Sequence, residues 1–242
     1  MHAVLEVTGR RELESPLMLR RTRFSLRCHM HVQNIFEETR TEILHALMRD
    51  YPLASVVTMT EEGMDANNIP FELDSSAGAL GTLRCHVGRS NPIWQSFRND
   101  PQILTIFQGP NAYISPRWYI NGQKSRRVFP SWNYAVVHAY GVMQVIDDRA
   151  WLLEHLSRLA SHNEKSLPSP WQLQEASPEF AEQAVANIIG LEISITKLVG
   201  KWQVSQQRTA ADRESVSNAL LARPNDVSAA TAELIRRVDH HL

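Results

Sequence analysis

Cysteine is nearly absent: the 242 residues contain two, Cys28 and Cys85. Two cysteines exclude the multi-disulfide scaffold of small secreted domains and a zinc site built from Cys-x-x-Cys motifs, so reduced cytosolic thiols are the default expectation. The formal net charge is −1, so the chain as a whole is not attracted to nucleic acid or to an anionic membrane. No apolar run approaches the roughly 18–20 residues that span a bilayer. We therefore expect a cytoplasmic protein without a membrane segment.

Several signatures of catalysis and metal binding are missing as well. There is no glycine-rich dinucleotide fingerprint and no Gly-x-Ser-x-Gly motif of a nucleophilic serine. Cys85 and His86 are adjacent in an extended segment, so their side chains point to opposite faces and cannot form a dyad. The histidines show no spacing that would bring three or four metal ligands together. We expect no metal site, and no residue is marked as catalytic.

Residues 1–29 differ in composition from the rest of the chain. They contain six arginines and no lysine, and their hydrophobic periodicity is poor. Two interpretations are open: a disordered basic arm that could touch nucleic acid phosphates, or an upstream extension with the natural start at Met30. We favour the extension or a poorly ordered tail, because the arginines lack a helical stripe. The rest is expected to form a domain over 30–222 and a C-terminal helix over 223–242.

The first half of the remaining chain alternates short apolar segments with turn residues. A helix is expected over 34–49, and strands are expected over 53–59, 67–73 and 80–83, followed by a helix over 91–98. Three strands joined by short turns predict an antiparallel meander.

The second half contains the longest expected strand, from Tyr134 to Val145. It is apolar or aromatic on both faces, which predicts a central position in the sheet. The other expected elements are a strand over 103–107, a turn at 108–111, a solvated basic loop at 121–127, a helix from Asp147 or Asp148 to about 161, a helix from Ser177, a strand over 191–199, and helices over 208–222 and 226–239. Together they predict an α+β protein, mainly β: a small β-barrel with peripheral helices.

One junction between a strand and a helix has the chemistry of an anion site. Asn91 is a good N-cap and Pro92 suits the first helical position, so the helix start would offer free N–H groups. Arg89 and Ser90 immediately precede it and would add a guanidinium and a hydroxyl. The alternative is an ordinary Asn-Pro cap beside a solvated arginine.

Aromatic residues and two histidines are the other candidates. Most of the aromatic side chains are expected to pack in the core or at an interface, but several stand beside turns, where they could stack on a flat conjugated ligand. The aromatic candidates are Tyr113, Trp118, Tyr119, Trp132, Tyr134, Trp171 and Trp202. His86 and His138 lie in expected strands. Three roles are open for each of them: a satisfied core imidazole, a metal ligand or an acid–base group.

Five motifs, in this order and spacing, closely resemble the PaiB-type family of FMN-binding negative transcriptional regulators. They are Asn91-Pro92, Phe107-Gln108-Gly109-Pro110, Tyr113-Ile114-Ser115-Pro116-Arg117-Trp118-Tyr119, Trp132-Asn133-Tyr134 with Val137-His138-Ala139-Tyr140-Gly141, and Gly200-Lys201-Trp202 through Ser205-Gln206. The similarity runs from about residue 30 to about residue 222. It implies an FMN-binding split β-barrel, with FMN at a homodimer interface contacted by both chains.

The resemblance also implies where FMN is bound. The segment from His86 to Asn91 is the expected phosphate site, and Lys201 and Trp202 are expected near the isoalloxazine or across the dimer. The full set of expected FMN contacts is His86, Arg89, Ser90, Asn91, Tyr113, Ser115, Trp118, Trp132, Asn133, Lys201, Trp202 and Gln206. The chain departs from the family pattern at Asn68, where a histidine is usual, and this weakens any proton transfer at that position.

The function implied by the resemblance is negative transcriptional regulation by an FMN-binding homodimer. Direct binding to DNA is not supported, because the net charge is near neutral and because there is no helix-turn-helix with a basic recognition helix. The alternative is an FMN-dependent oxidoreductase of the flavin reductase or pyridoxamine-phosphate oxidase kind, in which FMN supplies the redox chemistry. A haem-binding split barrel, with His86 or His138 as axial ligand, is the third and least favoured hypothesis.

Overall fold

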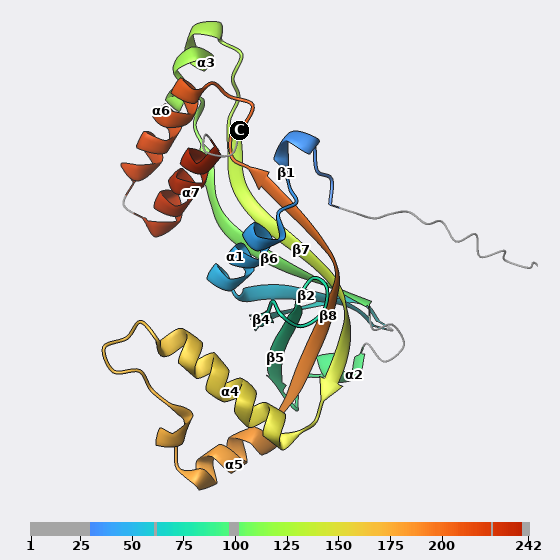
Figure 1. Ribbon diagram of the computed structural model, residues 1–242. Helices are drawn as coiled ribbons and strands as arrows, with labels where there is room; N and C mark the ends of the chain where they lie inside the picture. The colour runs from blue at the N-terminus through green and yellow to red at the C-terminus, as the bar shows by residue number, and fades with distance from the viewer. Residues whose placement is uncertain (1–29, 61, 97–101, 224, 239–242) are drawn as a thin grey trace, which may run out of the picture.

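A computed structural model describes residues 30–60, 62–96, 102–223 and 225–238. Its centre is one sheet of eight strands in the order β3-β2-β6-β7-β8-β5-β4, with β1 paired to β8 (Figure 1). All the strand pairs are antiparallel, and helices lie around the sheet, so the expected α+β, mainly β class is confirmed. The expected N-terminal arm or extension lies outside the described residues.

Three long strands form the middle of the sheet. They are β6 (Gln102–Ile114), β7 (Ser131–Ile146) and β8 (Ile188–Gln203). β7 pairs with β6 along one edge and with β8 along the other, which confirms the central position predicted from its two apolar faces. Its buried residues Ala135, Val137 and Ala139 point into the barrel, and the residues between them point to the opposite face.

The expected three-strand meander is wrong in its strand order. β2 (Leu53–Thr60) and β3 (Gly63–Pro70) form a hairpin at one end of the sheet, whereas β4 (Glu72–Asp74) and β5 (Thr82–Gly88) pair beyond β8 at the other end. β3 and β4 are consecutive in the chain although they lie at opposite ends of the strand order, because the sheet curls until its two ends meet. Asn91 Nδ2, just after β5, donates to Asn67 Oδ1 on β3 at 3.1 Å. The result is a barrel whose wall is open between β3 and β5 in the hydrogen-bond ladder.

Local chemistry moves several other expected boundaries. The helix expected over 34–49 begins only at α1 (Thr41–Asp50), because Glu38 accepts hydrogen bonds from the backbone and guanidinium of Arg40 and ends the short strand β1 (Glu37–Glu38). The turn expected at 108–111 is a β-bulge inside β6. Part of the expected loop at 121–127 is helix α3 (Ile120–Ser125), and the expected helix over 91–98 is described as α2 (Ile93–Ser96).

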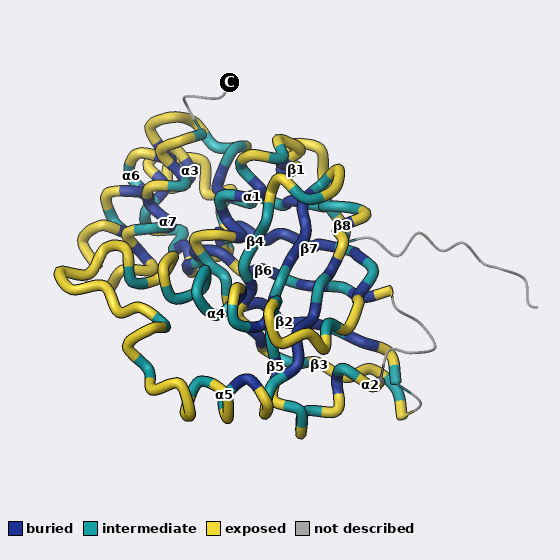
Figure 2. The backbone as a smooth tube through the Cα atoms, turned by 60° about the horizontal axis from the view of Figure 1, so that its bottom comes forward, coloured by how far each residue is buried: buried dark blue, intermediate teal, exposed yellow. Residues whose placement is uncertain are grey.

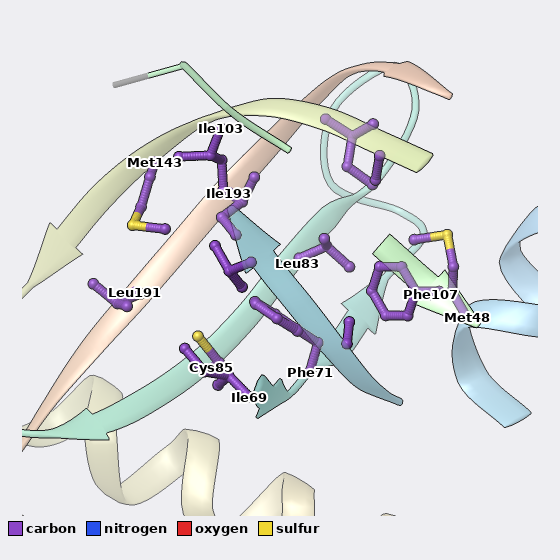
Figure 3. Close-up of a cluster of buried hydrophobic side chains, with 14 of the residues drawn as sticks. Met48, Ile69, Phe71, Leu83, Cys85, Ile103, Phe107, Met143, Leu191 and Ile193 are labelled. Atoms are coloured by element: carbon purple, nitrogen blue, oxygen red, sulfur yellow. The ribbon is translucent and has the colours of Figure 1, made fainter. Parts of the chain in front are cut away.

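The bulge in β6 lets α1 approach the sheet. A Cβ on Gly109 would stand 2.8 Å from Leu47 Cδ1, so a larger residue there would force Leu47 to shift. α1 then buries Leu44, Leu47 and Met48 against the inner face of the barrel. Side chains from β2, β3, β5, β6, β7 and β8 fill most of the rest of that core, among them Leu83 and Phe107, together with Phe71 from the junction of β3 and β4 (Figure 3). Each such side chain, fully buried, contributes about 1.5–3 kcal/mol to stability.

Helices close the two ends of the long strands. At one end η2 (Pro116–Trp118), α6 (Ala210–Leu221) and α7 (Asp226–Arg237) share a second core with the end of β6, and α3 lies against α6. At the other end lie α4 (Arg149–Glu164), η3 (Leu173–Glu175) and α5 (Pro178–Ala186), which are largely exposed (Figure 2). Asp148 caps α4 through Trp151 N at 2.7 Å, one of the two expected caps. None of the described helices combines the length and the hydrophobicity needed to cross a membrane.

Candidate functional site

The expected FMN contacts fall into two groups at opposite ends of the long strands. His86, Arg89, Ser90 and Asn91 lie at the end of β5, where His86 is paired with Gly190 of β8. The remaining eight lie near the other end of β6, β7 and β8. Twelve residues of β8 separate Gly190 from Trp202, which is about 40 Å of extended chain. One flavin cannot touch both groups within one chain, since a tricyclic ring with a five-carbon phosphate chain is far shorter.

Arg89 is already engaged with protein groups. Its guanidinium forms a two-pronged ion pair with Asp147, including a 3.0 Å bond from Nη1, and its Nε donates to the Ala186 carbonyl at 2.9 Å. The carboxylate of Asp147 raises the pKa of Arg89, and the guanidinium lowers the pKa of Asp147. A phosphate at this position would therefore have to share Arg89 with Asp147 or displace it.

The Asn-Pro junction forms the cap expected from the sequence. Asn91 Oδ1 accepts from Ile93 N at 3.0 Å, and Asn91 Nδ2 donates to Asn67 Oδ1. Trp94 Nε1 donates back to the Arg89 carbonyl at 3.0 Å and fixes the turn. Ser90 is exposed, and its hydroxyl has no hydrogen-bond partner among the described side chains. The junction is thus a rigid turn that presents the Ser90 hydroxyl to solvent.

His86 belongs to a polar network that no motif indicated. His86 Nδ1 lies 3.2 Å from His155 Nε2, and His155 Nδ1 lies 3.2 Å from Glu72 Oε2. His155 is fully buried and stacks on Trp151 with 5.1 Å between ring centroids. Arg158 Nε donates to the other oxygen of Glu72 at 2.9 Å. Sequence analysis missed Glu72, His155 and Asp147 because 58 to 83 residues separate each from its partner.

Three of the eight candidates at the other end lie on the outer face of the sheet, the face turned away from the barrel core. Tyr113 and Trp132 are directly paired across β6 and β7, are 41% and 50% exposed, and meet edge to face at 6.1 Å. Trp132 Nε1 donates to Asn111 Oδ1 at 3.2 Å. Lys201 Nζ lies 5.4 Å from the Tyr134 ring centroid and donates to the His31 carbonyl. These side chains form an aromatic surface with one cation beside it.

Four other candidates hold the scaffold together behind this surface. Asn133 is buried and bonds Ser205, and Gln206 Oε1 accepts from Val204 N at 2.8 Å. Ser115 Oγ accepts from Arg117 N at 3.3 Å, and Trp118 packs on the second core. Their described hydrogen bonds and packing are made within the protein, so their expected role as flavin contacts stays a prediction.

Trp202 points to the opposite side, into a cavity of about 390 Å³ between α1, β1 and α7 that Gln206 also lines. The charged lining consists of Glu37, Glu38, Asp50, Glu233, Arg40 and Arg237. Both arginines are paired with a carboxylate of the same lining. The excess of carboxylates makes this cavity a poor site for a phosphate dianion.

Comparison with known proteins places these features in a family. Residues 30–197 match the family described as "Putative FMN-binding domain". The chain is 29% identical to the protease synthase and sporulation protein PAI 2 of Bacillus subtilis, over 85% of this chain and 96% of that protein. It is also 29% identical to an uncharacterised protein of Emericella nidulans, over 86% of this chain and 96% of that protein.

Solved structures share the fold at low sequence identity. The flavocytochrome Anf3 from Azotobacter vinelandii matches with a TM-score of 0.52 and 16% identity, over 77% of this chain and 75% of that one. The FAD and heme binding protein from Mycobacterium smegmatis matches with a TM-score of 0.52 and 16% identity, over 69% of this chain and 73% of that one. These matches confirm the split β-barrel that was expected from the sequence.

Proposed function

Because the chain belongs to the FMN-binding domain family, we propose that it binds FMN between two copies of itself, on the outer face of the sheet. The homodimer, the choice of FMN over FAD and the regulatory role are all parts of this proposal. When bound, FMN carries its own redox chemistry. The residues of the chain bind it, orient its ring and exclude water.

The observation that carries the proposal is the uncovered outer face of β2, β6, β7 and β8. Among the described elements, α1 covers the inner face and the other helices lie toward the ends of the long strands (Figure 1). Half-buried and exposed apolar side chains line the outer face: Leu53, Val57, Met59, Leu104, Ile106, Val142 and Val199. The four strands contain 8, 13, 16 and 16 residues, so at about 3.3 Å per residue and about 4.8 Å between strands their face covers on the order of 800 Å². This is about the area that each partner buries in a stable dimer.

A buried polar atom on this face also lacks a partner. His138 Nδ1 is buried and unbonded in the described part of the chain, and its ring lies 6.5 Å from that of Tyr140. Buried ring nitrogens are normally satisfied, so we propose that the His138 ring turns Nδ1 toward this face when a flavin or a second copy of the sheet covers it. The exposed Tyr113–Trp132 pair on the same face offers rings on which a flat ligand can stack.

Two-fold symmetry reconciles the two distant groups of expected contacts. In a symmetric dimer, one end of a protomer can lie beside the opposite end of its partner. We propose that the ring of FMN lies against Tyr113, Trp132 and Lys201 of one chain. Its phosphate then lies at Arg89, Ser90 and Asn91 of the other chain.

We further propose that the protein is a negative transcriptional regulator. The Bacillus subtilis relative carries sporulation in its name, which is a cellular process and not a reaction. Among the described residues, an exposed set of cations that could contact DNA lies around α3: Arg117, Lys124, Arg126 and Arg127. Residues 102–146 contain these four cations and no carboxylate, although the whole chain is nearly neutral. Within the described part of the chain, none of the four has an ion-pair partner.

A titration of the purified chain with FMN, riboflavin and FAD tests the cofactor. On binding we expect the fluorescence of FMN to be quenched and its absorbance bands to shift. FMN should bind at least about tenfold more tightly than riboflavin, because only FMN brings a terminal phosphate for charged hydrogen bonds. Sedimentation should show a dimer that FMN stabilises. No spectral change with any of the three flavins would overturn the proposed function.

A further inference from the structure

The network of Glu72, His155 and His86 joins three elements that are distant in the sequence. Glu72 comes from β4, His86 from β5 and His155 from α4. His155 uses both ring nitrogens within the protein, one toward each neighbour. The remaining nitrogen of His86, Nε2, is bonded by no described residue and is not among the buried unpaired atoms, so it is open to solvent.

The hydrogen-bond roles follow from the carboxylate at one end. An ionised Glu72 can only accept, so His155 Nδ1 carries the proton and donates to it. With a single proton on its ring, His155 has a lone pair at Nε2, which accepts from His86 Nδ1–H. His86 is therefore left with a lone pair at the solvent-facing Nε2. The tautomers are assigned from the network, and each bond has one donor and one acceptor.

The groups around the network hold Glu72 ionised. Burial raises the pKa of Glu72, but hydrogen bonds from His155 and Arg158 outweigh it and hold that pKa below its ordinary value. Burial lowers the pKa of His86, and the positive charge that His155 carries when it is protonated lowers it further. The other charges that face the network are Glu154 on α4, Glu192 on β8, and Arg84 and Asp74, and they pair with Arg158 or with each other. His86 is thus neutral near pH 7 without a ligand.

We propose that Glu72, His155 and His86 form a proton relay that makes His86 Nε2 the proton-accepting contact for a phosphomonoester bound at residues 86–91. This inference rests on the proposed function, since it concerns the phosphate of the same FMN. A proton from solvent binds Nε2 as the phosphate binds, and His86 becomes a cation that donates to a phosphate oxygen. The relay lets Glu72 compensate that charge through His155. No covalent bond forms or breaks.

A phosphate at this segment needs this extra proton because Arg89 is already paired with Asp147. Asp147 already neutralises the guanidinium, so the segment offers a phosphate dianion little net positive charge. His86 stands three residues earlier at the same strand end and can supply the missing charge. Above the pKa that His86 has in the complex, each pH unit should weaken FMN binding by up to tenfold, because one proton is taken up.

Calorimetric titration in buffers of different ionisation enthalpy measures this proton directly. We expect FMN to take up as much as about one proton near pH 7, and riboflavin, which has no phosphate, to take up almost none. His86→Asn should abolish the uptake and flatten the pH dependence. His162→Asn changes an exposed histidine of α4 outside the network and should leave both unchanged. Uptake that persists in His86→Asn would overturn the relay.

A second measurement needs no variant and no ligand. Nitrogen NMR of the histidine rings should find the proton on Nδ1 in both His86 and His155, and a proton on Nε2 of neutral His86 would overturn the relay. The two proposals can fail separately. If FMN does not bind, the proposed function fails, and titration with inorganic phosphate at about pH 8, where phosphate is already the dianion, decides the relay: phosphate binding without proton uptake, or no phosphate binding, overturns it. If FMN binds without proton uptake, only the relay fails.

Discussion

Asn133 Nδ2 donates a 2.9 Å hydrogen bond to Ser205 Oγ in the interior of the protein. Ser205 has a φ of 67°, a left-handed conformation that serine rarely adopts. The bond ties the start of β7 to the chain immediately after β8, beneath the exposed Trp132. A side chain that was expected to touch FMN is thus bonded within the scaffold under the aromatic surface.

Asn133→Ala should destabilise the fold by about 1–3 kcal/mol, since it leaves the buried Ser205 hydroxyl without this partner. Urea unfolding measures the change. Asn68→Ala is the matched control, because Asn68 also bonds a serine hydroxyl, but on an exposed strand: Ser55 Oγ donates to Asn68 Oδ1 at 2.7 Å. The control should change stability by less than about 0.5 kcal/mol. Equal effects of the two substitutions would show that the buried bond has no special role.

Arg89 and Asp147 should have opposite effects on FMN affinity. Arg89→Ala removes a charged hydrogen bond to the phosphate and should weaken binding by about 10- to 100-fold. Asp147→Asn removes the competing carboxylate and should strengthen binding severalfold. Arg149→Ala removes a comparable exposed ion pair, with Glu182, and should change nothing. Fluorescence titration of the three variants measures the affinities, and an unchanged affinity in Arg89→Ala would move the phosphate site away from this junction.

The Glu72 network should stabilise the fold in a pH-dependent way. The pKa of Glu72 in the folded protein lies below its ordinary value of 4.5, so its stabilisation is complete above about that pH and is lost as the pH falls through the lowered pKa. Urea midpoints of the wild type and Glu72→Gln should differ most near pH 7 and converge toward pH 3. Glu179→Gln, at an exposed carboxylate, should show no such convergence. A constant difference for Glu72→Gln would contradict the assigned ionisation.

The regulatory proposal predicts salt-dependent DNA binding through the cations around α3. Replacement of Lys124, Arg126 and Arg127 by glutamine should weaken binding and reduce the slope of log affinity against log salt by about three. Replacement of Arg49, Lys165 and Arg223 by glutamine removes the same amount of positive charge and is the control, because these exposed residues lie outside that surface. Fluorescence anisotropy with labelled duplex DNA measures both. Equal losses in the two triple variants would assign the binding to net charge alone.

Local chemistry could be predicted from the sequence where it depends on neighbouring residues. The Asn91 cap, the Asp148 cap and the central position of β7 follow from short patterns, and all three are confirmed. The family motifs predicted the split barrel, although each motif by itself is too short to specify a fold.

Features that depend on long-range pairing could not be predicted. The place of β5 beyond β8 is set by pairing with residues 188–194, about a hundred positions away. The bulge at Gly109 resembles a turn in sequence, because Gln-Gly-Pro-Asn has turn residues, and only the approach of Leu47 explains it. The side-chain partners of His86 and Arg89 lie on α4 or immediately before it. No spacing rule connects them.

Mixing two variants that each lack one half of the site tests whether one flavin is held by residues from two chains. Arg89→Ala and Trp132→Ala should each lose high-affinity FMN binding as homodimers. When the two are mixed and allowed to exchange subunits, the heterodimer has one site with both Arg89 and Trp132, so about a quarter of the sites should recover. No recovery in a mixture that demonstrably forms heterodimers would contradict the shared site.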